Sequence, residues 1–112
     1  VAAGGDFSLL LRSDGKAIAV GCNTYGQCNL PEGLTYTQIA AGRSHAVLLT
    51  STGDAVAVGY NFWGGCNIPA LEGGLTYTQI AAGDGHTVLV RSDGTAVACG
   101  FASVTLLTIL LL

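Results

Sequence analysis

Residues 39–67 read IAAGRSHAVLLTSTGDAVAVGYNFWGGCN, and this stretch occurs almost three times in the chain. Residues 1–29 are an earlier copy, and residues 80–100 are a later, incomplete one. Three glycine columns stay in register across the copies: Gly4, Gly42 and Gly83; Gly15, Gly53 and Gly94; and Gly21, Gly59 and Gly100. A fixed internal period of this kind indicates a repeat protein in which each copy is one structural unit.

Each copy predicts short antiparallel strands joined by tight turns. In the first copy, the apolar runs at 7–12 and 17–21 flank Ser13-Asp14-Gly15, and glycine supplies the positive φ that hairpin turns need. The hairpin turns are expected at residues 13–15, 52–54 and 92–94. An Asn-x-x-Gly loop follows in two copies, and a short extended piece then stops at proline. Because proline suits the end of an edge strand, residues 27–30 and 65–68 are expected to form a fourth strand.

The repeat length fits a small antiparallel sheet. Four strands of about five residues and four connections of about four residues give roughly 36 residues, close to the 38 that separate Gly4 from Gly42. The strand at 45–49 is apolar on both sides, as expected for a sheet stacked between two others. We expect an all-β fold of tandem four-stranded antiparallel blades, with essentially no helix in residues 1–100. A β-solenoid is the rival architecture, which the Asp-Gly hairpins disfavour because they imply antiparallel neighbours.

The strand pattern also predicts which side chains are buried. The expected core comprises Val47, Leu49, Val56, Val58, Leu89, Val97 and Cys99. Leu9, Leu11 and Val20 are expected to join it where a neighbouring blade covers them.

The pattern Ala40-Ala41-Gly42, His45, Leu49 and Gly53, followed by Gly59, Asn61 and Gly64, resembles the repeat of the regulator of chromosome condensation family. The resemblance covers residues 1–100, and the short period is similar to that of the short-repeat branch. It implies an incomplete portion of a seven-bladed β-propeller, with the other blades in a longer parent chain. The copies are expected at 1–38, 39–79 and 80–100. Members of this family mostly bind other proteins; some catalyse nucleotide exchange on a small GTPase, and others belong to HECT-type ubiquitin ligases.

The composition argues against binding to nucleic acid and against a membrane anchor. The formal net charge of the 112 residues is −3, and the four Lys and Arg residues offer no electrostatic footprint for nucleic acid. Residues 101–112, FASVTLLTILLL, depart from the repeat and are shorter than the ~20 residues of a membrane helix. We interpret them as an aberrant apolar end outside the repeat, not as a membrane anchor. A cytoplasmic or nuclear location is expected.

The four cysteines show no zinc-binding spacing. Cys22 occupies the repeat position of Tyr60, and Cys99 that of Val20 and Val58. Positions that accept such side chains are packing positions, so buried free thiols are expected. A Cys22–Cys28 disulfide is the alternative, and it would indicate an oxidising compartment.

The two histidines are the obvious candidates for catalysis. His45 and His86 share one repeat position, which Phe7 fills in the first copy. A position that accepts phenylalanine is not that of a general base, so both rings are expected to be packed, with a nitrogen bonded to the backbone. No phosphate-binding loop is found. The sequence therefore predicts no catalytic residue, no cofactor and no metal, and the segment itself is not expected to be an enzyme.

Large aromatic residues mark the candidate binding site. Tyr25, Phe62 and Trp63 lie inside the Asn-x-x-Gly loops, and Arg43 lies at the edge of the same region. Aromatic residues on loops are typical interface anchors; the alternative is that they pack on the loop of the next blade.

These features favour a protein-interaction module that docks an unidentified protein through its loop aromatics. One alternative is the substrate-binding or regulatory propeller of a HECT-type ubiquitin ligase or of a guanine-nucleotide exchange factor. Another is a fragment without a stable fold of its own.

Overall fold

The computed structural model describes residues 1–61 and 64–100, and within them every regular element is a β-strand. The strands form three antiparallel sheets of three strands, in the order of the sequence. Blade 1 contains β1 (Ala2–Ala3), β2 (Phe7–Leu11) and β3 (Ala17–Gly21). Blade 2 contains β4 (Tyr36–Ala41), β5 (His45–Thr50) and β6 (Ala55–Gly59). Blade 3 contains β7 (Tyr77–Ala82), β8 (His86–Arg91) and β9 (Ala96–Gly100).

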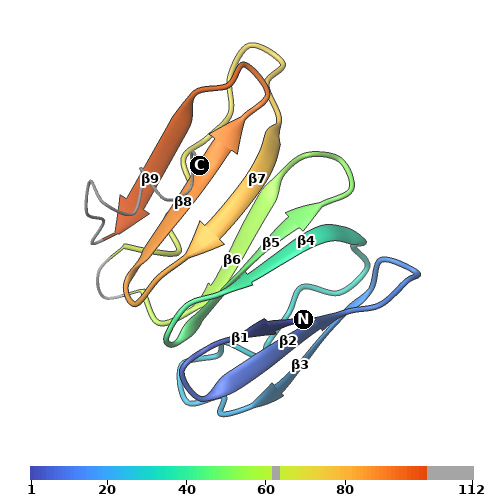
Figure 1. The fold of residues 1–112 in the computed structure, drawn as a ribbon, viewed down its shortest axis with the longest axis vertical. Helices are drawn as coiled ribbons and strands as arrows, with labels where there is room; N and C mark the ends of the chain where they lie inside the picture. Colours follow the sequence, from blue (N-terminus) through green and yellow to red (C-terminus); the bar gives the residue numbers. More distant parts are fainter. Residues whose placement is uncertain (62–63, 101–112) are drawn as a thin grey trace.

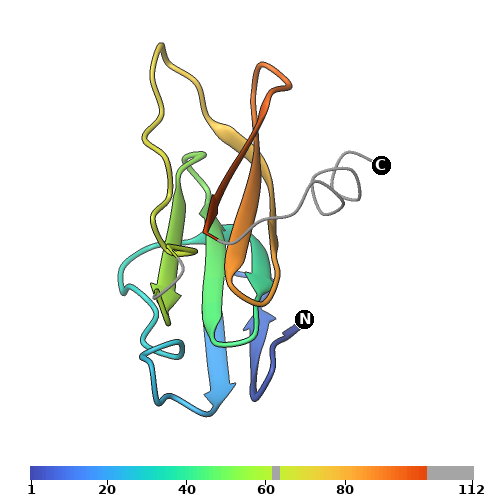
Figure 2. The ribbon, with the colours of Figure 1, turned by 90° about the vertical axis from the view of Figure 1, so that its left-hand side faces the viewer.

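The three blades stack in sequence order and fan out from their first strands (Figure 1). β4 contacts both β1 and β7, so the first strands of the blades are neighbours. The side view shows the segments that join one blade to the next running beside the sheets (Figure 2). The fold is all-β and is a portion of a β-propeller, as the repeat pattern predicts.

The hairpins between the second and third strands form where glycine allows them. The amide N–H of Gly15 donates to the carbonyl oxygen of Arg12 at 3.0 Å, and Gly15 has a φ of 86°. Gly53 and Gly94 repeat this arrangement, with φ values of 91° and 86°. Three-residue loops that end in a left-handed residue are a common way to close a hairpin. The predicted turns are confirmed, except that the second occupies residues 51–53 instead of 52–54.

The predicted fourth strand is wrong. Residues 27–28 and 65–66 lie in turns, residues 29–30 and 67–68 have no regular secondary structure, and each sheet ends at its third strand. The backbone N–H groups of these segments find partners locally: Asn29 donates to the carbonyl of Gly26 at 3.0 Å, and Cys28 donates to the side chain of Asn23 at 2.8 Å. A backbone donor satisfied within its own loop is not available to a neighbouring strand.

The core lies between the blades. Each blade has a forward side, which packs on the following blade, and a rear side, which packs on the preceding one. Phe7 and Leu9 on the forward side of blade 1 cluster with Ala46 and Leu48 on the rear side of blade 2. Leu49 likewise packs with Leu89 of blade 3.

The predicted core is confirmed in part. Leu9, Val47, Leu49 and Leu89 are buried, and the half-buried positions are Leu11, Val56, Val58, Val97 and Cys99. Val20 is 51% exposed, because the described residues place no blade over the rear side of blade 1.

In each copy, the ring at the start of the second strand packs directly on the glycine three residues before it. A Cβ atom on Gly4 would lie 2.4 Å from the Phe7 ring, and one on Gly42 would lie 2.3 Å from the His45 ring. Gly83 has the same relation to His86, at 2.1 Å. Because no side chain fits at so short a distance, the glycine of each copy is required by the ring three residues later.

The second and third copies are 41 residues apart (Gly42 to Gly83), while the first and second are 38 apart (Gly4 to Gly42). The extra residues lie in the segment that joins blade 2 to blade 3. The hydroxyl of Tyr36 donates to the carbonyl of Pro31 at 3.0 Å, and Tyr77 makes the same bond to Pro69. The second of these segments is three residues longer, and it turns through Gly73 and Gly74, both with positive φ. The extra residues are therefore accommodated outside the blades.

Candidate functional site

One end of the blade array carries Tyr25 and Arg43, two of the predicted binding residues, and we call it the loop face. It consists of the turns at 4–6, 42–44 and 83–85 and of the loops at 22–29, 60–61 and 64–67. Backbone bonds join the two kinds of segment: Cys22 donates to the carbonyl of Asp6 at 3.0 Å, and Tyr60 to that of Ser44 at 2.9 Å. The hairpins at 13–15, 51–53 and 92–94 lie at the opposite end of the strands, the hairpin face.

Paired asparagines close the loops of this face. The side-chain amide of Asn23 donates to Asn29 at 2.9 Å, while its oxygen accepts the Cys28 N–H at 2.8 Å. Asn61 makes the same two bonds, to Asn67 and from Cys66, at 2.9 and 2.8 Å. The same clamp occurs in two copies, and in the first loop it restrains the segment that carries Tyr25.

Tyr25 lies on the first of these loops and is 51% exposed. Its ring contacts that of Tyr60 in blade 2, with the centroids 4.7 Å apart and the planes at 60°. Its amide N–H donates to the side chain of the buried Gln27 at 2.9 Å. Tyr25 thus packs on the next blade, as the alternative interpretation expects, and still offers half of its surface to solvent.

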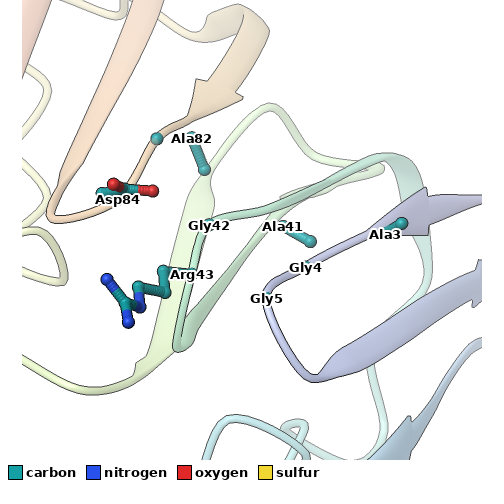
Figure 3. Close-up of a pocket in the computed structure, with 9 residues that line it drawn as sticks. Ala3, Gly4, Gly5, Ala41, Gly42, Arg43, Ala82 and Asp84 are labelled. Carbon is teal, nitrogen blue, oxygen red and sulfur yellow. The ribbon is translucent and has the colours of Figure 1, made fainter.

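Arg43 lies on the turn of blade 2, next to a shallow pocket of about 200 Å³. The pocket is lined by the three turns that join the first and second strands of the blades, including Gly5, Arg43 and Asp84. The amide N–H of Gly5 donates to the carbonyl of Arg43 at 3.1 Å, which fixes the first two turns together. Figure 3 shows the side chains of Arg43 and Asp84 projecting from neighbouring turns.

The structure thus places Tyr25 and Arg43 on one face. Phe62 and Trp63, the other two predicted binding residues, lie outside the described residues. That these four side chains bind a partner remains a prediction.

The two histidines are packed, as predicted. His45 is 1% exposed, and its Nε2 lies 3.0 Å from Oγ1 of Thr87 in blade 3. The bond at Nε2 is therefore to a side-chain hydroxyl, and the ring also makes the expected hydrogen bond with the backbone, at His86. Burial lowers the pKa of His45, against a backbone hydrogen bond with His86 that raises it. The ring is a packing element of the junction between two blades.

All four cysteines are free thiols. Sγ of Cys28 lies 3.3 Å from the carbonyl oxygen of Cys22, and Sγ of Cys99 lies 3.6 Å from that of Gly65. Burial and the neighbouring Cys99 raise the pKa of Cys66 to about 11. The structure therefore shows the free-thiol form and not the Cys22–Cys28 disulfide.

Residues 1–61 and 64–100 contain no cluster of His, Cys, Asp or Glu that could hold a metal ion. In the same residues there is no helix long and apolar enough to cross a membrane. The predictions about enzymatic activity, cofactors and location stay predictions.

Stacked antiparallel blades with a repeated glycine frame define this chain as a segment of a β-propeller. A family model described as Regulator of chromosome condensation (RCC1) repeat matches residues 1–27, 36–62 and 77–103, one match in each copy. These matches cover most of the sequence, and the chain belongs to this family.

Solved structures share the fold at low sequence identity. Prp20p of Saccharomyces cerevisiae is 24% identical over 88% of this chain, with a TM-score of 0.75, and human WBSCR16 is 21% identical over 89%, also with a TM-score of 0.75. The Crinkly ectodomain of the receptor kinase ACR4 from Arabidopsis thaliana is 19% identical over 89%, with a TM-score of 0.68. The chain spans about a third of each of them, 32%, 34% and 35% respectively. The comparison with curated proteins gave no match.

Proposed function

We propose that the chain is a protein-interaction segment of a β-propeller and that it docks a protein partner through the loop face. The observation that carries this proposal is the half-exposed Tyr25 on a loop that the Asn23–Asn29 pair holds in one conformation. A large aromatic side chain on a rigid loop offers contact area at small entropic cost. The regular positions of the repeat are used for packing between blades, so specificity must come from the loops.

The composition of the loop face supports a protein partner. Its described charged side chains are Asp6, Arg43 and Asp84, and its other residues are mostly glycine and asparagine, with Tyr25 and Tyr60 as the aromatic residues. Interfaces between proteins are enriched in tyrosine and arginine and depleted of lysine and glutamate. We infer that Tyr25 and Arg43 are contacts, with Phe62 and Trp63 as further anchors on the second loop.

One protein with this fold has been described with several protein partners. A crystal structure holds yeast RCC1 (Prp20) bound to Kap60, and the Prp20p structure was described with its binding to Gsp1p and histones. These partners belong to Prp20p. They support the class of function proposed here, while a role in a ubiquitin ligase or in nucleotide exchange rests on family resemblance alone.

The proposal is tested by comparing loop-face and hairpin-face variants of the full chain. Proteins captured by the immobilised chain are quantified by mass spectrometry, with the double variant Tyr25→Ala, Arg43→Ala in parallel. The matched control is Leu34→Ala, Lys16→Ala, which removes an exposed apolar side chain and a cation near the hairpin face. A specific partner should be retained at least about tenfold less by the loop-face variant and equally by the control.

The second loop has its own variant, Phe62→Ala, Trp63→Ala. Equal retention by wild type and by both loop-face variants, with all of them folded, would show that the loop face does not bind the partner.

A further inference from the structure

The segment that joins blade 1 to blade 2 borders a pocket beside β3. The pocket has a volume of about 380 Å³, within the usual range for ligand sites. Five of its eight lining residues are apolar or aromatic, and the full set is Lys16, Ala17, Leu30, Pro31, Glu32, Gly33, Leu34 and Tyr36. Both blades that border it and the whole segment between them belong to this chain, so its walls need no further blade.

One wall of this pocket is held in place by the core. Tyr36 is 4% exposed, and its hydroxyl donates to the carbonyl of Pro31 at 3.0 Å. Ala17 and Leu30 pack against the core cluster that contains Tyr36. Leu34, which also lines the pocket, is 41% exposed. A preformed wall beside an exposed leucine can bind an apolar side chain at little cost in conformational entropy.

The second copy of the repeat shows what a longer segment places beside the same core. The segment after blade 2 reads PALEGG at residues 69–74, where the segment after blade 1 reads PEG at residues 31–33. Leu71 is half-buried and packs against the cluster that contains Tyr77, the counterpart of Tyr36. Leu75, the counterpart of the exposed Leu34, is half-buried as well. The shorter first segment has no counterpart of Leu71, and the pocket lies where that side chain is missing.

We propose that the pocket binds a peptide segment of a partner protein, which inserts a leucine side chain as Leu71 does in blade 2. The charges indicate what lies next to that leucine. Lys16 lines the pocket, whereas the same repeat position in blade 2 is Asp54. Within the residues that the structure describes, Lys16 forms no ion pair. An unpaired cation at an apolar pocket favours a ligand with a carboxylate beside its leucine.

This pocket is separate from the loop face. Lys16 directly follows the hairpin turn at 13–15, so the pocket opens near the hairpin face. Its ligand is therefore a different one from the partner proposed for the loop face, and neither proposal depends on the other. A loop-face partner should bind equally well when Lys16 and Leu34 are changed.

Nuclear magnetic resonance of the full chain tests the proposal. The probe is the peptide acetyl-Ala-Leu-Glu-Gly-amide, which copies residues 70–73. Up to about 5 mM peptide should shift the amide signals of Ala17, Leu34 and Tyr36 in a saturable way, with a Kd of about 0.1–1 mM. The amide of Cys28, on the loop face, should not shift. The same peptide with alanine in place of leucine should bind at least about tenfold more weakly, because it buries less apolar surface.

Matched variants locate the peptide in the pocket. Leu34→Ala should weaken binding at least about threefold, while Ile18→Ala, at a position of similar exposure outside the pocket, should not; the two exposed fractions are 41% and 42%. Lys16→Ala should weaken binding, and Arg12→Ala, which removes another cation of the same hairpin, should not. Glu32→Gln should strengthen binding, because it removes a like charge from the neighbourhood of the peptide carboxylate.

A graft fills the pocket from within the chain. Inserting Ala-Leu after Pro31 and Gly after Gly33 reproduces PALEGG between blades 1 and 2. This chain should remain folded in thermal melts and should no longer bind the peptide, because its own leucine occupies the site. The same insertion with Asp in place of Leu is the control, and it should still bind.

Three results would overturn the proposal. The first is the absence of saturable shifts at the pocket amides up to about 5 mM peptide. The second is equal binding by Leu34→Ala and Ile18→Ala chains, or by the leucine and alanine peptides. The third is a shift of the pocket amides when the chain alone is concentrated, which would make the occupant a second copy of this chain and not a separate partner.

Discussion

Nε2 of His45 in blade 2 lies 3.0 Å from Oγ1 of Thr87 in blade 3. The threonine hydroxyl donates its own proton to the carbonyl of Gly65 at 2.6 Å, so it accepts the proton of the imidazole. Both side chains are buried, with exposed fractions of 1% and 0%. The buried position of His45 is thus explained by a hydrogen bond between blades and needs no catalytic role.

Removing the hydroxyl should destabilise the fold. Thr87→Val keeps the shape of the side chain but leaves the buried Nε2 of His45 without its partner, at a cost of about 1–3 kcal/mol. Thr87→Ser keeps the hydroxyl and should cost less. The free energy of unfolding, measured in urea, distinguishes them, and a Thr87→Val chain as stable as wild type would show that this bond contributes nothing.

The contact between blades 1 and 2 suggests two substitutions that should compensate for each other. There the ring is Phe7 and the residue at the threonine position is Ala46, and both belong to one buried cluster. The double variant His45→Phe, Thr87→Ala places that pair of side chains in the contact between blades 2 and 3. It should be more stable than the two single variants predict by addition, because neither polar partner is left unpaired. Additive losses in this double-mutant cycle would contradict a direct coupling.

The buried imidazole also makes stability depend on pH. Burial lowers the pKa of His45 in the folded chain below its ordinary value of 6.5. As the pH falls below 6.5, the unfolded chain therefore binds a proton that the folded chain does not bind. This contribution to stability is complete above 6.5 and is lost as the pH falls toward the folded pKa. Urea midpoints should decrease from about pH 7.5 to about pH 5.5, and the decrease should be smaller in His45→Phe; an equal decrease in both would contradict the assignment.

The repeat frame and hairpins were predictable because they depend on local residues. The backbone at Gly15 and the ring of His45 above Gly42 are each determined within one copy, and the sequence compares three copies side by side. The fourth strand was not predictable, since the same extended residues suit a strand or a loop clamped by Asn23. The exposure of Val20 depends on which blade covers it, and that information is not in the local pattern.

Some buried residues were missed although a signal existed. Tyr36 and Tyr77 are 4% and 3% exposed, and both begin the repeated segment Tyr-Thr-Gln-Ile-Ala-Ala-Gly. Their identity in two copies was a sign of a structural role, which the bond to a proline carbonyl now explains. The contact of Tyr25 with Tyr60 had no such signal, because Cys22 occupies the Tyr60 position in the first copy.

Leu48 and Leu10 occupy the same repeat position, but only Leu48 is covered by a neighbouring blade. The two residues therefore test how much packing between blades contributes to stability. Leu48 is fully buried, while Leu10 is 37% exposed. Leu48→Ala should cost about 2–4 kcal/mol through the cavity that it leaves, and Leu10→Ala should cost less than about 1 kcal/mol. Equal losses in urea unfolding would mean that the two rear sides are covered to the same extent.

Cys66 tests whether the second loop is packed against blade 3. Its pKa is raised to about 11, chiefly by burial, so very little of it is the reactive thiolate near neutral pH. In the folded chain, alkylation of Cys66 by iodoacetamide at about pH 8 should be at least about tenfold slower than that of a free cysteine. In urea the two rates should become equal. Peptide mass spectrometry measures each site, and a native rate equal to the denatured one would show that this thiol is not buried.

The last prediction concerns the clamp that holds Tyr25. Asn23→Ala removes two hydrogen bonds at once, to Asn29 and from the amide of Cys28, at 2.9 and 2.8 Å. Because the loop is partly exposed to water, we expect a loss of only about 1 kcal/mol in stability. The local effect should be larger: hydrogen exchange of the Cys28 amide should accelerate, since its acceptor is gone, while amides in β5 remain protected. Asn61→Ala should do the same to Cys66 in the second loop. If the amide of Cys28 stays as protected in Asn23→Ala as in wild type, the side chain of Asn23 does not fix the loop, and the rigidity on which the proposed docking depends must have another source.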